Sequence, residues 1–151
     1  MVSSCQKRVA VESSFSPTPI TIDIPANFPT IEHPSENPLT QEGVNLGRHL
    51  FWEKKLSGNN TMNCASCHFP EKAFSDPSNV SVGINGDLGT RNAMVLQNLA
   101  WSKDFFWDGR SISLEQQILV PVLDSTEMDE TWANFLSEIE YDNNYRNMFF
   151  E

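Results

Sequence analysis

The string Cys64-Ala65-Ser66-Cys67-His68 is the part of this chain whose residue types and spacing could do chemistry. Two thiols separated by two residues can each add across one vinyl group of a haem, and a histidine directly after them can face the iron as a ligand. The string therefore predicts a covalently attached c-type haem. Cys64 and Cys67 would be the attachment points, and His68 would be the proximal ligand of the iron.

Zinc binding and thiol redox chemistry are the alternative uses of a cysteine pair. A zinc site would need two more ligands, and the chain offers only Cys5, His33, His49 and carboxylates, with no second paired motif. A thioredoxin-type pair needs a strand-helix unit around it, whereas residues 57–61 read Ser-Gly-Asn-Asn-Thr, which is typical of a loop. Haem attachment is the better interpretation of the motif.

Size and charge narrow the class of protein. At 151 residues the chain is long enough for one domain with a hydrophobic core. Twenty acidic and ten basic residues give a net charge of −10, which argues against nucleic acid as a partner. An acidic surface suits a basic soluble electron carrier, although it supports solubility equally well.

The N-terminal segment differs from the rest in composition. Residues 1–38 hold six of the nine prolines, so residues 1–35 are predicted to form a tether or an extended surface wrap. Val2-Ser3-Ser4-Cys5, within residues 1–5, is similar to the end of a bacterial lipoprotein signal, in which the cysteine is lipidated. Cys5 is therefore either a lipid anchor or a free thiol. No run of about 18 apolar residues that could span a membrane occurs in the sequence.

Helical patterns begin at Thr40, which is predicted to cap a helix containing Leu46, Leu50 and Phe51 at helical spacing. No internal repeat and no alternating strand pattern is present. The remainder of the chain therefore has to build its core from helices.

Three further helices are expected after the cysteine motif. One covers residues 92–100, a second follows a capping box at Ser113 and is limited by Pro121, and a third follows a cap at Asp129. Residues 76–90, with three glycines, are predicted to be a long and functional loop. The sum is an all-α, cytochrome c-like haem domain of short helices joined by long irregular loops.

Several short motifs follow one another in a single order over about residues 36–130. They are Glu36-Asn37-Pro38-Leu39, Leu46-Gly47-Arg48, Ala73-Phe74-Ser75-Asp76, Arg91-Asn92-Ala93, Phe105-Phe106-Trp107-Asp108-Gly109-Arg110, Leu114-Glu115-Gln116-Gln117, Pro121 and Glu127-Met128. Together they resemble the first haem domain of bacterial di-haem cytochrome c peroxidases and their MauG-like relatives. The resemblance implies that residues 36–151 are the peroxide-reacting haem domain and the N-terminal part of a longer protein with a second haem motif.

The resemblance also implies roles for individual side chains. Glu127 and Gln117 would lie over the distal face of the haem, Trp107 would lie between the two haems, and Asn92 would help to bind calcium at the domain junction. A carboxylate in a mostly apolar pocket can take a proton from one oxygen of peroxide and return it to the other. Gln117 could orient the peroxide, and Trp107 could carry an electron. Taken singly, Glu127 could equally start a helix, Gln117 could be a surface amide and Trp107 could serve packing.

One departure from the family pattern concerns the long loop. Many members carry a histidine after Ser-x-Gly that ligates the peroxide-reacting iron until reduction elsewhere releases it. Here Ser81-Val82-Gly83 is followed by Ile84 and Asn85, neither of which could bind iron in that way. We therefore expect a resting haem that has five ligands or binds water, and that reacts with peroxide without prior activation.

The resemblance implies that the protein reduces hydrogen peroxide to water. The electrons would come from a small donor protein, either a cytochrome c or a cupredoxin, and the protein would be a monomer or a homodimer. Two alternatives remain: a mono-haem electron carrier with methionine as the second ligand, and a MauG-like enzyme whose haem oxidises residues of a partner protein. Covalent haem attachment takes place on the outer face of the bacterial inner membrane. The protein is therefore expected in the periplasm, either free or anchored through Cys5.

Overall fold

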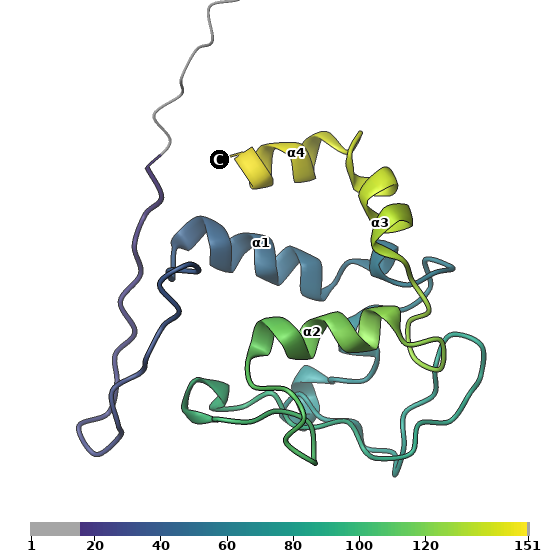
Figure 1. The fold of residues 1–151 in the computed structure, drawn as a ribbon, viewed down its shortest axis with the longest axis horizontal. Coiled ribbons are helices and arrows are strands. Elements are labelled where there is room, and N and C mark those ends of the chain that lie inside the picture. The colour runs from purple at the N-terminus through teal and green to yellow at the C-terminus, as the bar shows by residue number, and fades with distance from the viewer. Residues whose placement is uncertain (1–15, 151) are drawn as a thin grey trace, which may run out of the picture.

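The structure is a computed structural model that describes residues 16–150, so the predicted lipid anchor at Cys5 lies outside the described residues. Within this range the chain forms four α-helices and no β-sheet, and paired single residues make isolated bridges only. The helices, labelled in Figure 1, are α1 (Gln41–Phe51), α2 (Leu114–Leu123), α3 (Trp132–Ile139) and α4 (Asn143–Phe150). Four short 3-10 turns, Lys54–Leu56, Cys64–Ser66, Pro70–Lys72 and Leu99–Trp101, interrupt the long loops between α1 and α2. The all-α prediction is confirmed.

Side-chain caps start the first two helices where the sequence predicts them. The Thr40 hydroxyl accepts the N–H of Gly43 at 3.0 Å and begins α1. The Ser113 hydroxyl accepts the N–H of Gln116 at 3.2 Å, and the Gln116 side chain accepts the N–H of Ile112 at 3.3 Å. These bonds satisfy backbone donors that a helix start otherwise leaves unpaired.

The helix predicted over residues 92–100 is wrong. Only Leu99–Trp101 form a helical turn, and Asn98 before them has a left-handed backbone with φ of 55°. The preceding residues 92–97 form no helix or strand, and the carbonyl of Phe74 accepts the N–H of Leu96 at 3.3 Å. Tertiary contact therefore overrides a weak local helical tendency.

Two predicted helix boundaries are also wrong. Pro121 lies inside α2, which continues to Leu123, because proline removes its own donor but the N–H of Asp124 still reaches the carbonyl of Val120 at 3.0 Å. The cap of α3 is Thr131 rather than Asp129. Asp129 has a left-handed backbone with φ of 48°, and its carboxylate accepts the amide of Asn85 at 3.2 Å.

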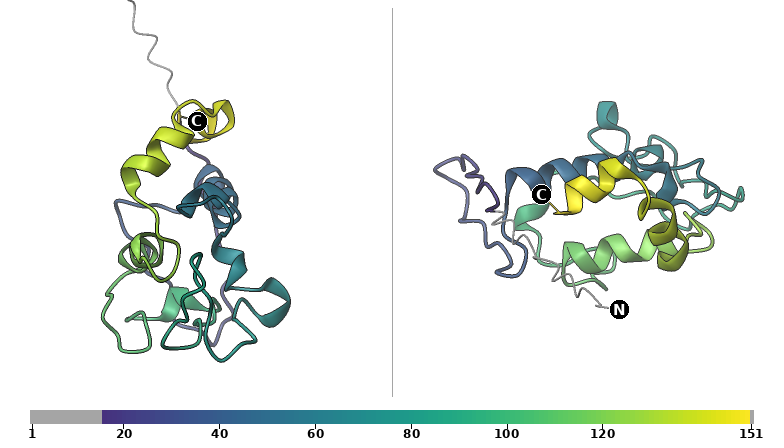
Figure 2. Two further views of the ribbon diagram at one scale, coloured as in Figure 1. Left: turned by 90° about the vertical axis from the view of Figure 1, so that its right-hand side faces the viewer. Right: turned by 90° about the horizontal axis from the view of Figure 1, so that it is seen from above.

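The hydrophobic core joins α2, α3 and α4 to the turn after α1. Its buried members are Leu56, Val122, Met128, Phe135, Ile139 and Tyr145, with Leu46, Leu50 and Trp132 packed against them. Figure 2 shows α4 lying along α1, with α2 on the other side of the molecule. Two polar contacts hold α4 to the turn: the Tyr145 hydroxyl donates to Glu53 at 2.6 Å, and Lys55 pairs with Asp142 at 2.8 Å. Among the described helices, none is both long and apolar enough to cross a membrane.

The proline-rich segment folds back on itself beside α1 and runs from the purple end of Figure 1. The N–H of Ile20 reaches the carbonyl of Leu39 at 3.1 Å, which pairs the two legs of the segment near α1. Trp101 donates its indole N–H to the carbonyl of Pro29 at 2.8 Å and stacks edge-on against Phe28. Residues 18–40 therefore lie against the domain, while the predicted boundary between residues 35 and 36 stays a prediction.

Candidate haem site

A cavity of about 850 Å³ lies between the cysteine turn, the extended segment before Leu99, the loop before α2 and α2 itself. The side chains that line it include every site residue predicted from the sequence: Cys64, Cys67, His68, Asn92, Trp107, Gln117 and Glu127. These residues are separated by up to 63 positions in the chain, from Cys64 to Glu127. The fold therefore brings together the predicted attachment, ligand and distal residues around one space.

The cysteine motif forms a tight turn. The N–H groups of Cys67 and His68 both reach the carbonyl of Cys64, at 3.2 and 3.0 Å. Burial raises the pKa of Cys64 to about 11, and burial also raises the pKa of Cys67, with Asp76 and Glu127 adding to the rise. Reactive cysteines of redox motifs have lowered pKa values instead, so these thiols do not resemble a redox pair.

A zinc site finds no further support in the described part of the chain. Between residues 16 and 150, no three His, Cys, Asp or Glu side chains come close enough together to hold a metal ion. The two thiols and one imidazole around this cavity fit the thioether bonds and axial ligand of a c-type haem.

His68 is held in one orientation by the backbone of the following loop. Its Nδ1 lies 3.1 Å from the carbonyl oxygen of Phe74. Because a carbonyl can only accept, Nδ1 carries the proton, and Nε2 keeps a free lone pair for a metal. Ala73 and Phe74 both have φ of 58°, a left-handed conformation that is costly outside glycine. This strained turn aims the carbonyl at the histidine, and no side-chain pattern in the sequence could have revealed it.

Gln117 projects from α2 into the cavity wall. Its Oε1 is buried and, among the described residues, has no hydrogen-bond partner. Buried polar atoms in proteins nearly always have a partner, and exceptions call for a bound group that supplies one. The side chain therefore fits a ligand that carries an O–H donor into this space, as peroxide or water would.

Glu127 lies on the segment that follows α2, where backbone bonds fix its position. Its N–H donates to the carbonyl of Asp124 at 3.0 Å, and its carbonyl accepts the N–H of Ile84 at 2.9 Å. Although the residue keeps part of its surface exposed, burial of the carboxyl raises the pKa of Glu127 above 4.5. The charge of Asp124 acts in the same direction, and Arg110 opposes it. A carboxyl with a raised pKa is suited to both accepting and returning a proton.

The loop that carries Gly83 packs its backbone directly on the Glu127 segment, which gives a stability prediction. A Cβ added at Gly83 would overlap the carbonyl oxygen of Thr126. We expect Gly83→Ala to lower the free energy of unfolding by about 1–3 kcal/mol, because the backbone of the Gly83 loop and that of the Thr126–Glu127 segment would have to move apart. Gly47→Ala in α1 is the control: a Cβ there meets open space, so we expect it to raise that free energy by roughly 0.5–1 kcal/mol. Chemical denaturation of the two variants measures both changes, and equal destabilisation would contradict the packing argument.

Trp107 occupies a tight loop between Phe105 and Ser111, which are joined by backbone bonds of 2.8 and 3.3 Å. Its side chain lines the cavity and is also 63% exposed, so it connects the cavity with the surface. The indole N–H donates to the carbonyl of Asn92 at 2.7 Å. The Asn92 amide in turn donates to the carbonyls of Asp76, at 3.0 Å, and Ser78. Asn92 thus supports Trp107 in this structure, and its predicted calcium role stays a prediction.

Asp76 anchors the long loop beneath the cavity, a role that the sequence did not reveal. Its carboxylate accepts the N–H of Ser78 and the hydroxyl of Ser81, each at 2.7 Å. Burial acts to raise the pKa of Asp76, but these hydrogen bonds outweigh it and the pKa is lowered. Residues 76–90 form a loop, as predicted. The ionised carboxylate of Asp76 holds this loop in place through Ser78 and Ser81.

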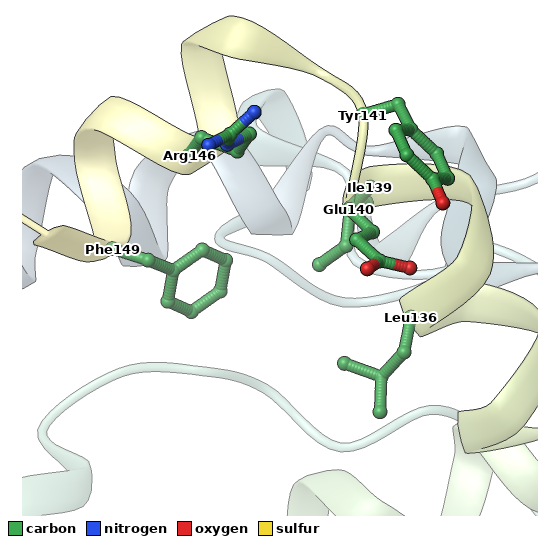
Figure 3. Close-up of a pocket in the computed structure, with 6 residues that line it drawn as sticks. All are labelled: Leu136, Ile139, Glu140, Tyr141, Arg146 and Phe149. Carbon is green, nitrogen blue, oxygen red and sulfur yellow. The ribbon is translucent and has the colours of Figure 1, made fainter. Parts of the chain in front are cut away.

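A second hollow of about 690 Å³ lies between α3 and α4. Figure 3 shows the side chains of Leu136, Ile139 and Phe149 directed into one space, with Glu140 beside them. The hollow contains neither a cysteine nor a histidine. None of the predicted site residues lines it, so the predicted haem site is the first cavity.

Comparison with known proteins agrees with this site. A family model described as di-haem cytochrome c peroxidase matches residues 41–151. The chain belongs to this family. The predicted resemblance is therefore confirmed, and membership of the di-haem cytochrome c peroxidase family implies haem as the cofactor.

Individual members of the family show how much of the length is shared. The chain is 33% identical to the methylamine utilization protein MauG of Methylophilus methylotrophus, over 80% of this chain and 36% of that protein. It is 31% identical to the cytochrome c peroxidase Ccp of Escherichia coli K12, over 83% of this chain and 27% of that protein. The crystal structure of a MauG-like protein associated with microbial copper homeostasis matches with a TM-score of 0.80 and 35% identity, over 86% of this chain and 39% of that one. The chain thus spans well under half the length of these relatives.

Proposed function

We propose that this chain is the peroxide-reacting haem domain of a bacterial di-haem peroxidase, which reduces hydrogen peroxide to two molecules of water with two electrons and two protons. The haem would be joined to Cys64 and Cys67 by thioether bonds and ligated by Nε2 of His68. The observation that carries the proposal is the single cavity lined by the cysteine turn together with Gln117 and Glu127.

The residues of the chain would supply the proton transfers and the positioning. When bound, the haem would supply an iron that accepts the peroxide and passes electrons to it. Glu127 would take a proton from one peroxide oxygen and return it to the other, for which a raised pKa is favourable. The unpaired Oε1 of Gln117 would accept the remaining O–H and orient the molecule. Phe105, which is buried, and Phe106 would keep the site poor in water.

Electrons would reach the site from a second haem domain and, before it, from a small donor protein such as a cytochrome c or a cupredoxin. Trp107 is our candidate for the bridge because it lines the cavity and is largely exposed. The same position would let it pass electrons from a partner protein, as the MauG-like alternative requires. We further propose that the protein is located in the periplasm and that Cys5 is a lipid anchor. In addition, we propose that calcium binds near Asn92 and that the protein forms a homodimer.

The resting state of the haem tests this function against the electron-carrier alternative. His68 is the one histidine that lines the cavity among residues 16–150, and the Asn85 side chain binds Asp129 instead. We expect the purified haem-loaded protein to show a high-spin ferric spectrum at rest, which changes when peroxide is added without a reductant. Absorption and electron paramagnetic resonance spectra measure both. A purely low-spin haem that ignores peroxide would favour the electron carrier.

A further inference from the structure

Two separate loops bind the backbone of the segment that carries Glu127. The N–H of Ile84 donates to the carbonyl of Glu127 at 2.9 Å, and the N–H of Gly58 donates to the carbonyl of Met128 at 2.9 Å. The two acceptors are neighbouring carbonyls of one short segment, so the loops hold it at adjacent residues. The loop of Gly58 has no part in the function proposed above.

Gly58 is required for space rather than for an unusual backbone conformation. Among the described glycines only Gly86 and Gly109 have a positive φ, so alanine could adopt the conformation of residue 58. A Cβ at Gly58 would instead overlap the carbonyl oxygen of Asp129, and it would lie 3.7 Å from Cδ1 of Ile84. Because the overlap is with backbone, no side-chain rotation can relieve it, and the neighbouring segment has to move.

The loop of Gly58 leads directly to the cysteine turn. Ser57 is fully buried, and its hydroxyl accepts the N–H of Met62 at 3.0 Å and lies 2.9 Å from the Met62 carbonyl. These contacts close the loop into one unit. Met62 lines the haem cavity and precedes Cys64 by two residues. One short unit of chain therefore joins the predicted haem attachment turn to the segment of Glu127.

We propose that Gly58 is a positioning residue for Glu127, because its N–H and its lack of a side chain fix the path of the Met128–Asp129 backbone relative to the cysteine turn. The inference rests on the proposed function, since it concerns where the Glu127 carboxyl lies with respect to a haem held at Cys64 and Cys67. Proton transfer requires the two groups to be within hydrogen-bond reach, and a misplacement of about 1 Å can cost on the order of 10²-fold in rate.

The first test follows the position of the segment without turnover. In haem-loaded Gly58→Ala the segment should move away from its partners, so the amide of Ile84 should exchange its hydrogen about tenfold faster. The reference is the amide of Val44 in α1, which donates to the carbonyl of Thr40 at 3.0 Å and should keep its exchange rate. Gly47→Ala, whose Cβ meets open space, is the matched control and should speed neither amide. An unchanged Ile84 amide, or equal acceleration at Ile84 and Val44, would overturn the inference.

The second test asks whether the effect on rate runs through Glu127. Gly58→Ala should lower the rate of peroxide reduction about ten- to hundredfold, with the haem content unchanged. In the Glu127→Gln background the same change should cost less than about twofold, because the group that it displaces is already absent. Equal losses in the two backgrounds, or a full rate in Gly58→Ala alone, would contradict the proposed role.

Ser57→Ala is the second variant should Gly58→Ala fold poorly. It removes the buried hydroxyl that closes the same loop and adds no bulk, so we expect a loss in rate of about two- to fivefold that again disappears in Glu127→Gln. A loss that persists in that background would count against the inference here too. Full peroxide reduction by Glu127→Gln alone would instead overturn the proposed task of Glu127, while hydrogen exchange still decides the role of Gly58, so the two failures are distinguishable.

Discussion

Glu127→Gln is expected to lower the rate of peroxide reduction by the haem-loaded protein roughly 10²- to 10⁴-fold, the range over which a positioned acid-base group acts. Glutamine keeps the size and the backbone contacts of the segment, which run to Asp124 and Ile84, but it cannot accept and return a proton. Stopped-flow measurement of the reaction with peroxide gives the rate, and the haem absorbance shows that the cofactor is retained.

The pH dependence of the rate of peroxide reduction tests the same role of Glu127. The rate depends on the Glu127 carboxylate and should fall as pH drops through a pKa that lies above the usual 4.5, and this limb should vanish in Glu127→Gln. Asp129→Asn is the matched control, because Asp129 is two residues away, does not line the cavity and can keep an amide partner in Asn85. A full rate and an intact limb in Glu127→Gln would remove this residue from the chemistry.

Replacing both Cys64 and Cys67 with alanine should abolish covalent haem attachment. Each thiol adds its S–H across one vinyl group, so each single variant should keep one bond and the double variant should keep none. Both thiols line the cavity, and neither is consumed in a disulfide. Denaturing electrophoresis with haem staining, together with the mass of the intact protein, measures the number of chains that carry haem.

The control for the cysteine experiment is the third thiol of the chain. Cys5→Ala removes a cysteine outside the motif and should leave the haem content unchanged. Haem that resists denaturation in the double variant would show that the group is bound by another linkage, and the assignment of the turn at residues 64–68 would then be wrong.

Local patterns were sufficient where a short stretch of chain controls its own conformation. Thr40 and Ser113 start helices because their hydroxyls satisfy backbone N–H groups three residues later. The cysteine motif predicted its own chemistry, because two thiols and an imidazole within five residues can be placed by a single turn. The same short range explains why the all-α class and the loop over residues 76–90 were correctly predicted.

Local patterns failed where contacts from distant parts of the chain compete with them. Residues 92–97 line the cavity as a loop instead of forming a helix, partly because the N–H of Leu96 donates to the carbonyl of Phe74. Asp129 lost its predicted capping role because its carboxylate pairs with Asn85, which is 44 residues away in the sequence. The free energies of such contacts are similar to local helix propensities, so either can prevail.

The amino-acid order alone was enough to predict a haem and the residues that would attach and ligate it, since this chemistry is encoded in neighbouring side chains. The distal side was different. That Gln117 and Glu127 share one cavity with His68, that the Phe74 carbonyl orients the histidine and that Arg110 stacks on Phe106 all depend on packing between separate segments. Side-chain types specify what each group can do, whereas its protonation and orientation arise from burial and from neighbours that only the folded chain brings together.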